Sequence, residues 1–257
     1  MHNPYIGITD FMNSNQVHEM LKVFIENRRT GSERKLHVGV MMSYKTLHGL
    51  PTKWQTAFPP KETVSSIFLG YEYAGIFNVL HYADYDGIDV SDNLLLATGF
   101  GGQNLDALQL DMIWPLPEIV KNYRQRYPNI QIILQGNTKA LEAVGNDIPT
   151  FIKRLAEYGD SIDFILLDKS MGRGLGMDAV GLIPIAQAIN DSLPSLGLAA
   201  AGGLGPETLH LVEPMAKVFP NLSIDAQGKL RPSGNALDPI DWEMAKNYLI
   251  KALQLLG

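Results

Sequence analysis

Near its C-terminus the chain reads FILLDKSMGRGLG (Phe164–Gly176), then LGLAAAGGLG (Leu196–Gly205) and then LSIDAQG (Leu222–Gly228). Each segment is an apolar run that is followed by glycines or a charged residue. Such a run, about four to seven residues long, is typical of a strand that is buried on both faces in a parallel sheet. The intervening segments Asp178–Leu193 and Pro206–Val218 read as helices. Strands that alternate with helices predict an α/β fold with a parallel sheet.

The glycines that follow these strands predict a ligand as well as a fold. A glycine just past a parallel strand lets backbone N–H groups approach an anion at the start of the next helix. Barrel enzymes often bind phosphate after their seventh and eighth strands, and Pro206 marks a helix start directly after one of these turns. Tight helix–strand packing is the alternative reason for such glycines. We expect N–H donors to a phosphate-bearing small molecule from Gly172, Gly174, Gly202, Gly203 and Gly228.

Composition narrows the class of protein. A length of 257 residues suits one eight-fold barrel, since about 250 residues are typical of that fold. The formal net charge of −6 disfavours nucleic-acid binding, which usually needs a basic patch. The absence of cysteine excludes disulfides and a thiol nucleophile. Neither a signal peptide nor an apolar run of membrane-spanning length is recognisable, so we expect a cytoplasmic protein with no membrane partner.

Eight strand–helix units can be counted along residues 1–257, which predicts a single (β/α)₈ TIM barrel with no second domain. Asn13 or Ser14, Ser91 and Asp238 are the expected caps of the first, third and last helices. The polar segment Ser43–Lys61 is too long for an ordinary connection and is a candidate lid or binding loop. The predicted strands are Tyr5–Thr9, Leu36–Met42, Gly75–His81, Ala107–Met112, Ile130–Gln135, Ile162–Asp168, Gly197–Ala201 and Leu222–Asp225.

An open doubly wound sheet is the main competing architecture. That fold usually carries a glycine fingerprint at its first strand–helix turn. Here the first turn, Thr9–Met12, contains no glycine, and Gly172, Gly174 and Gly176 lack the full G-x-G-x-x-G spacing. The barrel therefore remains the favoured prediction.

Five strand ends carry distinctive motifs: PYIGIT (Pro4–Thr9), LQLDM (Leu108–Met112), LLD (Leu166–Asp168), AAGGLGPET (Ala200–Thr208) and DAQG (Asp225–Gly228). In chain order they resemble the motifs K-I-C-G-I-T, V-Q-L-H-G, L-L-D, L-A-G-G-L-x-P-E-N and D-V-S-S-G of phosphoribosylanthranilate isomerase. Members of that family are barrel enzymes of tryptophan biosynthesis. The match is strongest over the last three motifs. The resemblance implies an eight-stranded barrel.

The same resemblance implies a chemistry, the isomerisation of an aminoaldose to an aminoketose with an aspartate as acid and a cysteine as base. Asp168 matches the acid of the family. Ile6 stands where the family has its cysteine, and isoleucine cannot carry a proton. Asp111 replaces a histidine, and Lys45 is the cation nearest to the place of a substrate-binding arginine. These departures from the family pattern imply that another residue is the base or that the substrate is different.

The residues themselves identify candidates for acid–base catalysis. Asp168 and Asp111 both follow predicted strands, and two carboxylates that face one cavity can serve as acid and base. A purely structural role for each, such as pairing of Asp168 with a neighbouring cation, is the alternative. Asp10 is a third candidate base, unless GITD only caps the first helix. Arg173 is a candidate contact for a substrate phosphate or carboxylate.

Three functions stay open at this stage. The favoured one is acid–base isomerisation of a phosphorylated sugar-like metabolite, without a metal or an organic cofactor. A regulatory barrel that binds such a metabolite without turning it over is the second. A Schiff-base lyase or aldolase that uses Lys169 is the third. The acidic segment His81–Asp89 lacks the spacing of a known metal motif, so we expect it to be a solvated loop, and the chain could be a monomer or a homodimer.

Overall fold

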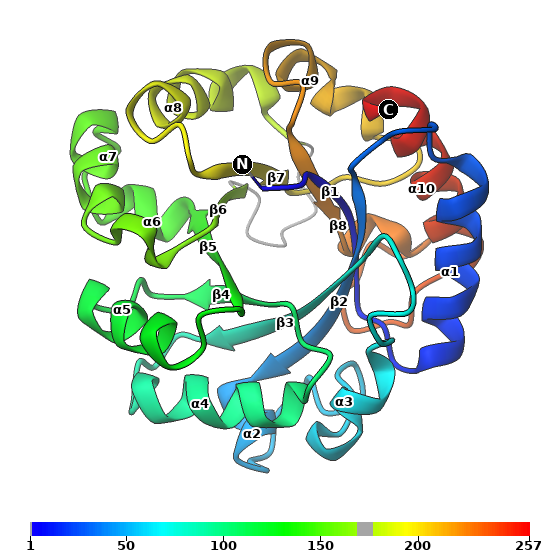
Figure 1. The fold of residues 1–257 in the computed structure, drawn as a ribbon, viewed down its shortest axis with the longest axis horizontal. Coiled ribbons are helices and arrows are strands. Elements are labelled where there is room, and N and C mark those ends of the chain that lie inside the picture. The colour runs from blue at the N-terminus through cyan, green and yellow to red at the C-terminus, as the bar shows by residue number, and fades with distance from the viewer. Residues whose placement is uncertain (1, 169–176) are drawn as a thin grey trace.

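Eight parallel strands form a closed barrel in the computed structural model, which describes residues 2–168 and 177–257. Each strand pairs with the next along the chain, and β8 pairs with β1 to close the ring. Figure 1 shows the helices arranged around the outside of this ring. The predicted barrel is confirmed. The strands are β1 Tyr5–Thr9, β2 Lys35–Ser43, β3 Ile76–Asp84, β4 Ala107–Met112, β5 Gln131–Asn137, β6 Phe164–Asp168, β7 Gly197–Ala201 and β8 Ser223–Ala226.

Four strands end later than the sequence predicted, namely β2, β3, β5 and β8. β2 and β3 stay paired up to Ser43 and Ala83, so both continue past the predicted ends at Met42 and His81. β4 and β7 have the predicted bounds. The extra residues of β2 and β3 carry the backbone to the edge of the barrel, where the loops begin.

The helices of the described residues are α1 Ser14–Asn27, α2 Tyr44–Leu47, α3 Val64–Ile67, α4 Val90–Gly101, α5 Pro117–Arg126, α6 Thr138–Glu142, α7 Ile148–Ala156, α8 Ala179–Ser192, α9 Glu213–Val218 and α10 Trp242–Leu256. Short 3₁₀ segments lie at η1 Lys61–Thr63, η2 Gly159–Ser161, η3 Leu209–Val212 and η4 Gly228–Leu230. Within these described ranges, no helix has both the length and the apolar character that a membrane span requires.

Helix starts are where the sequence prediction failed most often. Asn13 caps α1, as expected, by accepting a hydrogen bond from Gln16 N. α10 begins at Trp242 and is capped by Asp241 rather than Asp238, because the Asp241 carboxylate accepts from the backbone N–H groups of the first turn. Ser91 does not cap α4, since the helix already begins at Val90. The predicted helix over residues 62–71 shrinks to η1 and the four residues of α3.

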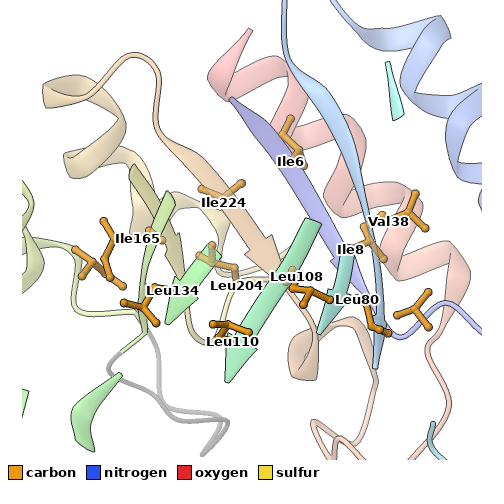
Figure 2. Packing of buried hydrophobic residues seen from close by; sticks show 14 of the residues in the cluster. Ile6, Ile8, Val38, Leu80, Leu108, Leu110, Leu134, Ile165, Leu204 and Ile224 are labelled. Carbon is orange, nitrogen blue, oxygen red and sulfur yellow. The ribbon is translucent and has the colours of Figure 1, made fainter. Parts of the chain in front are cut away.

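The strands bury two separate sets of side chains. Ile6, Ile8, Val38, Leu80 and Ile224 are fully buried in the large cluster between strands and helices (Figure 2). The alternate residues point into the barrel, because successive strand side chains face opposite sides. The inward residues near the strand starts form a second apolar cluster, which closes that end of the barrel: Tyr5, Phe77, Val79, Ala107, Ile133, Phe164, Leu166 and Ala199.

Candidate active-site cavity

A cavity of about 940 Å³ opens at the carboxyl ends of the strands, and residues of all eight strands line it. This is the end at which characterised TIM-barrel enzymes place their active sites. The inward residues change from apolar near the strand starts to polar here, where the lining includes Gln109, Asp111, Gln135, Asp168 and Asp225. The cavity is therefore the candidate site.

The segment Ser43–Lys61 supplies part of the wall, including Lys45, as well as Trp54 and Phe58. The rings of Trp54 and Phe58 stack with centroids 5.3 Å apart. Lys61 Nζ donates to Leu47 O at 2.7 Å and ties the two ends of the segment together. The insertion predicted as a binding loop thus lies against the candidate site.

Asp111 lies at the end of β4 among polar neighbours. Together they form a group that we call the acidic wall: Tyr85, Asp111, Asn137, Lys139 and Asp168. Tyr85 donates its hydroxyl hydrogen to Asp111 Oδ1. Asn137 caps α6 through its Oδ1 and donates from Nδ2 to Tyr85 Oη at 3.2 Å. Lys139 Nζ lies 4.1 Å from the centre of the Tyr85 ring. The capping of one helix therefore fixes the phenol that orients Asp111.

Burial raises the pKa of the Asp111 carboxyl to about 6. The hydrogen bond from Tyr85 opposes the rise, the negative charge of Asp168 adds to it, and the ammonium of Lys139 opposes it. Asp168 is buried, ends β6 and is in register with Asn137 on β5. The two aspartates predicted as a catalytic pair therefore line one cavity and interact electrostatically.

The turn after β7 and the start of η4 form a second surface, the glycine wall, which consists of Gly202, Gly203, Gly228 and Lys229. All four residues line the cavity. Gly202 and Gly203 have φ angles of 106° and 68°, a backbone conformation that favours glycine. Gly205 leaves the backbone of Lys229 room to approach, because a Cβ there would lie 2.6 Å from Lys229 O. Gly172, Arg173 and Gly174 fall outside the described residues, as does Lys169.

Asp10, the third predicted catalytic aspartate, does not contribute to the cavity lining. It is buried in an ion pair with Arg231 Nη2 and accepts two hydrogen bonds from Gln227 Nε2, each 3.1 Å long. Arg231 also donates to Gln227 O at 2.8 Å. Asp10 thus links the loop after β1 to the loop after β8.

The sequence did not reveal a buried polar group at the bottom of the cavity, which we call the floor cluster: Thr9, His37, His81, Gln109 and Asp225. His37 Nε2 and His81 Nε2 lie 2.8 Å apart, and Gln109 Nε2 lies 3.1 Å from His81 Nδ1. Thr9 Oγ1 donates to the Asp225 carboxylate at 3.0 and 3.1 Å. The available signal was the alternation along β2 and β3, which turns His37 and His81 toward the barrel interior.

Burial also determines the protonation of the floor cluster. It lowers the pKa of His81 to about 3 and the pKa of His37 well below its usual value. Both imidazoles are therefore neutral at physiological pH.

The acidic segment His81–Asp89 is less solvated than expected, because the buried Asp84 carboxylate accepts hydrogen bonds from Asp86 N and Gly87 N, both 3.0 Å long.

Comparison with solved structures places the fold among TIM barrels. N-(5'-phosphoribosyl)anthranilate isomerase from Pyrococcus furiosus aligns with 97% of this chain and 98% of its own, at a TM-score of 0.55 and 13% identity. Ribulose-1,5-bisphosphate carboxylase/oxygenase from Pyrococcus horikoshii aligns with 99% of this chain and 60% of its own, at a TM-score of 0.54 and 13% identity. A protein of Aquifex aeolicus aligns with 98% and 92% of the two chains, at a TM-score of 0.51 and 11% identity.

No protein-family model matches the sequence, and no curated protein matches it. Identities of 11–13% establish a shared fold and leave the chemistry to be argued from the site. The residue that the resemblance aligned with the catalytic cysteine, Ile6, is fully buried in the cluster between strands and helices. Its side chain therefore does not reach the cavity.

Proposed function

We propose that this protein isomerises a phosphorylated sugar-like metabolite by general acid–base catalysis. The observation that supports the proposal is one cavity that is lined by Tyr85, Asp111 and Asp168 of the acidic wall and by the glycine wall. The acidic wall supplies two interacting carboxylates, and the glycine wall supplies a turn of the kind that binds phosphate after barrel strands seven and eight.

In this proposal Asp168 is the acid and Asp111 is the base. Asp168 gives a proton to the ring oxygen of the sugar, the bond between this oxygen and C1 breaks, and the C1 hydroxyl passes its proton to Asp168, so that C1 becomes an aldehyde. Asp111 then removes the hydrogen on C2 while Asp168 gives its proton to the C1 oxygen, and the electron pair of the C2–H bond forms the double bond of an enediol. Asp111 returns its proton to C1 and the C2 hydroxyl passes its proton to Asp168, which gives the ketose and restores both carboxyl groups.

The environment of Asp111 suits the role of a base. A carboxylate with a pKa of about 6 is ionised at neutral pH and is more basic than an ordinary aspartate. Tyr85 donates its hydrogen to only one of the two carboxylate oxygens, Oδ1. Positioned groups of this type each contribute roughly 10²–10⁴-fold to a rate.

The phosphate of the substrate would bind at Gly202, Gly203 and Gly228. Lys229 adds a positive charge to this part of the lining, and Lys45 adds another from the segment after β2. Backbone N–H groups together with a flexible ammonium are a common combination for phosphate recognition.

Ligand-induced thermal stabilisation tests the phosphate site first. We expect sugar phosphates such as ribose 5-phosphate, and the ribulose phosphate product of the anthranilate reaction, to raise the melting temperature, while the free sugars do not. A ligand at a hundred times its Kd adds about 2.7 kcal/mol of stability. Lys229→Gln should weaken the response, and Lys217→Gln on the exposed surface of α9 is the matched control. Equal responses to phosphorylated and free sugars would contradict the phosphate site.

Turnover then tests the acid. Asp168→Asn should lower kcat for the sugar phosphate that binds best by at least about 10², with an unchanged circular dichroism spectrum. Asp160→Asn, which changes an exposed aspartate, is the matched control. An unchanged kcat in the Asp168 variant would remove this residue from the mechanism.

A further inference from the structure

We propose that His37, His81 and Asp225 bind one divalent transition-metal ion, of the Zn²⁺ or Fe²⁺ class, at the floor of the cavity. From the sequence we expected no metal, and the acid–base steps above do not require one. The inference stands on the geometry of the floor cluster alone.

The three side chains present their ligand atoms to a common point. One nitrogen of each histidine and one carboxylate oxygen of Asp225 lie within 4.8 Å of one another, and all three residues are buried. Ligands at the usual distances of about 2.0–2.1 Å from a tetrahedral ion lie roughly 3.3 Å apart. The two Nε2 atoms, now 2.8 Å apart, would separate by about half an ångström, and the Asp225 oxygen would move closer by up to about 1.5 Å.

Two inward-facing strand glycines provide the space for this group. A Cβ on Gly7 would lie 2.5 Å from Asp225 Oδ1. A Cβ on Gly39 would lie 2.5 Å from Thr9 Oγ1 and 3.0 Å from His81 Nε2. The barrel interior therefore lacks side chains on β1 and β2 at the height where the histidines and the carboxylate converge.

The surroundings of Asp225 also suit a metal ligand, because its carboxyl group is buried without a cationic partner among the described side chains. Its side chain is 6% exposed, and Thr9 is the side chain that donates a hydrogen bond to it. Among residues 2–168 and 177–257, no lysine, arginine or histidine nitrogen lies within 4.0 Å of this carboxylate, whereas the buried Asp10 has Arg231. Buried carboxylates are usually paired with a cation or coordinate a metal.

The arrangement of the two imidazoles suits metal binding, because one ring nitrogen of each faces the other. Metal-binding imidazoles bind through a lone pair, and the second ring nitrogen usually donates its hydrogen to an outer partner. Gln109 lies at that second nitrogen of His81. In the structure the amide nitrogen of Gln109 faces His81 Nδ1, so metal binding through Nε2 requires the Gln109 amide to rotate by half a turn, after which its carbonyl oxygen accepts the Nδ1 hydrogen.

The site is accessible from the cavity. His81 and Asp225 belong to the cavity lining, whereas His37 lies below them and does not. Three protein ligands with an open position toward a substrate pocket are the arrangement of catalytic zinc sites, and imidazole with carboxylate suits Zn²⁺ and Fe²⁺. The open position would take an oxygen atom of a ligand in the cavity.

Metal content of the full-length protein, produced without a histidine tag, tests the inference. After treatment with EDTA and gel filtration, the protein is mixed with Co²⁺ and, separately, with Zn²⁺. We expect one equivalent of either ion per chain by elemental analysis, and visible d–d absorption of Co²⁺ in a low-symmetry site. Addition of Zn²⁺ should abolish the Co²⁺ spectrum.

Variants locate the ion. His81→Gln and Asp225→Asn should each weaken Co²⁺ binding by more than about 100-fold, since even outer-shell changes cost roughly 10–100-fold. His18→Gln, on the exposed face of α1, is the control and should bind as the wild type does. If a ligand variant fails to fold, the wild-type stoichiometry and spectrum still decide the matter.

Two results would overturn the proposal. One is a wild-type protein that retains less than a tenth of an equivalent of Co²⁺ and Zn²⁺. The other is stoichiometric binding that persists in a folded His81→Gln or Asp225→Asn variant, because this places the ion elsewhere. In either case the contact between His37 and His81 is a hydrogen bond between neutral imidazoles.

Discussion

Asp10 and Asp111 are aspartates at or directly after the end of a barrel strand, Asp10 buried and Asp111 partly buried, yet their surroundings differ in one respect. Asp10 is neutralised by the guanidinium of Arg231 and does not line the cavity. Asp111 lines the cavity, and its direct partner is the neutral hydroxyl of Tyr85. The same residue type at equivalent places of the fold therefore has two different electrostatic environments.

The difference shows what makes a strand-end carboxylate available for chemistry. Burial raises the pKa of Asp10 as well, but the guanidinium of Arg231 and the amide of Gln227 oppose this rise and occupy lone pairs of the carboxylate, so that Asp10 holds two loops together. A phenol leaves lone pairs free, and burial without a full counter-charge raises the pKa of Asp111 to about 6. We therefore assign Asp10 to stability and propose Asp111 for catalysis.

Removal of Asp10 should have the largest effect on stability. Asp10→Ala leaves Arg231 as a buried and unpaired charge, and breaking a buried pair in this way costs about 3–5 kcal/mol. Urea unfolding followed by circular dichroism measures the loss, with Asp160→Ala on the surface as the control. A loss below about 1 kcal/mol would mean that the pair does not hold the two loops together.

Asp111→Asn should reduce the activity of the protein rather than its stability. Asparagine retains the shape of the side chain and cannot accept a proton, so kcat for the sugar phosphate should fall by about 10²-fold or more. The fold should remain intact by circular dichroism. An active Asp111→Asn protein would transfer the role of base to another residue.

The stability of the Asp111→Asn variant should also depend on pH. The folded-state pKa of Asp111, about 6, exceeds the unfolded value of about 3.9, so ionisation favours the unfolded chain as the pH rises between these values. The melting temperature of the variant relative to the wild type should therefore increase from pH 4 to pH 8. A constant difference would contradict the raised pKa.

Tyr85→Phe should give the smallest change. The hydrogen bond from Tyr85 lowers the pKa of Asp111, so its removal should raise that pKa further. The acid limb of the kcat/KM profile, which reports protonation of the base, should shift to higher pH, with a modest loss of kcat at neutral pH. A shift to lower pH would show that Tyr85 does not donate to Asp111.

The barrel was predictable because short apolar runs and amphipathic segments alternate eight times along the chain. The same reasoning placed Asp111 and Asp168 at the cavity, since inward residues at the carboxyl ends of strands converge in this fold. Helix starts were less predictable. Asp238 and Asp241 are both good caps, and the choice between them depends on tertiary contacts, including the hydrogen bond from Ser233 Oγ to Asp238 Oδ2.

The partners of the carboxylates could not be predicted from the sequence. Asp10 and Arg231 are 221 residues apart, and only closure of the barrel between β1 and β8 brings them together. His37 and His81 are 44 residues apart and lie within apolar strands, where the pattern indicates core rather than chemistry. Tyr85 follows β3 in an acidic loop, and nothing in its local sequence points to Asp111.

Exchange of the C2 hydrogen of a sugar phosphate with deuterium from the solvent tests the central claim most directly. Proton NMR in D₂O follows the loss of the C2 signal for each aldose phosphate that stabilises the protein. We predict exchange with wild-type protein, little exchange with Asp111→Asn, and none above background with the free sugar. Two results would contradict this prediction. One is that aldose phosphates bind and none of them exchanges its C2 hydrogen, and the other is equal exchange with the wild type and with Asp111→Asn.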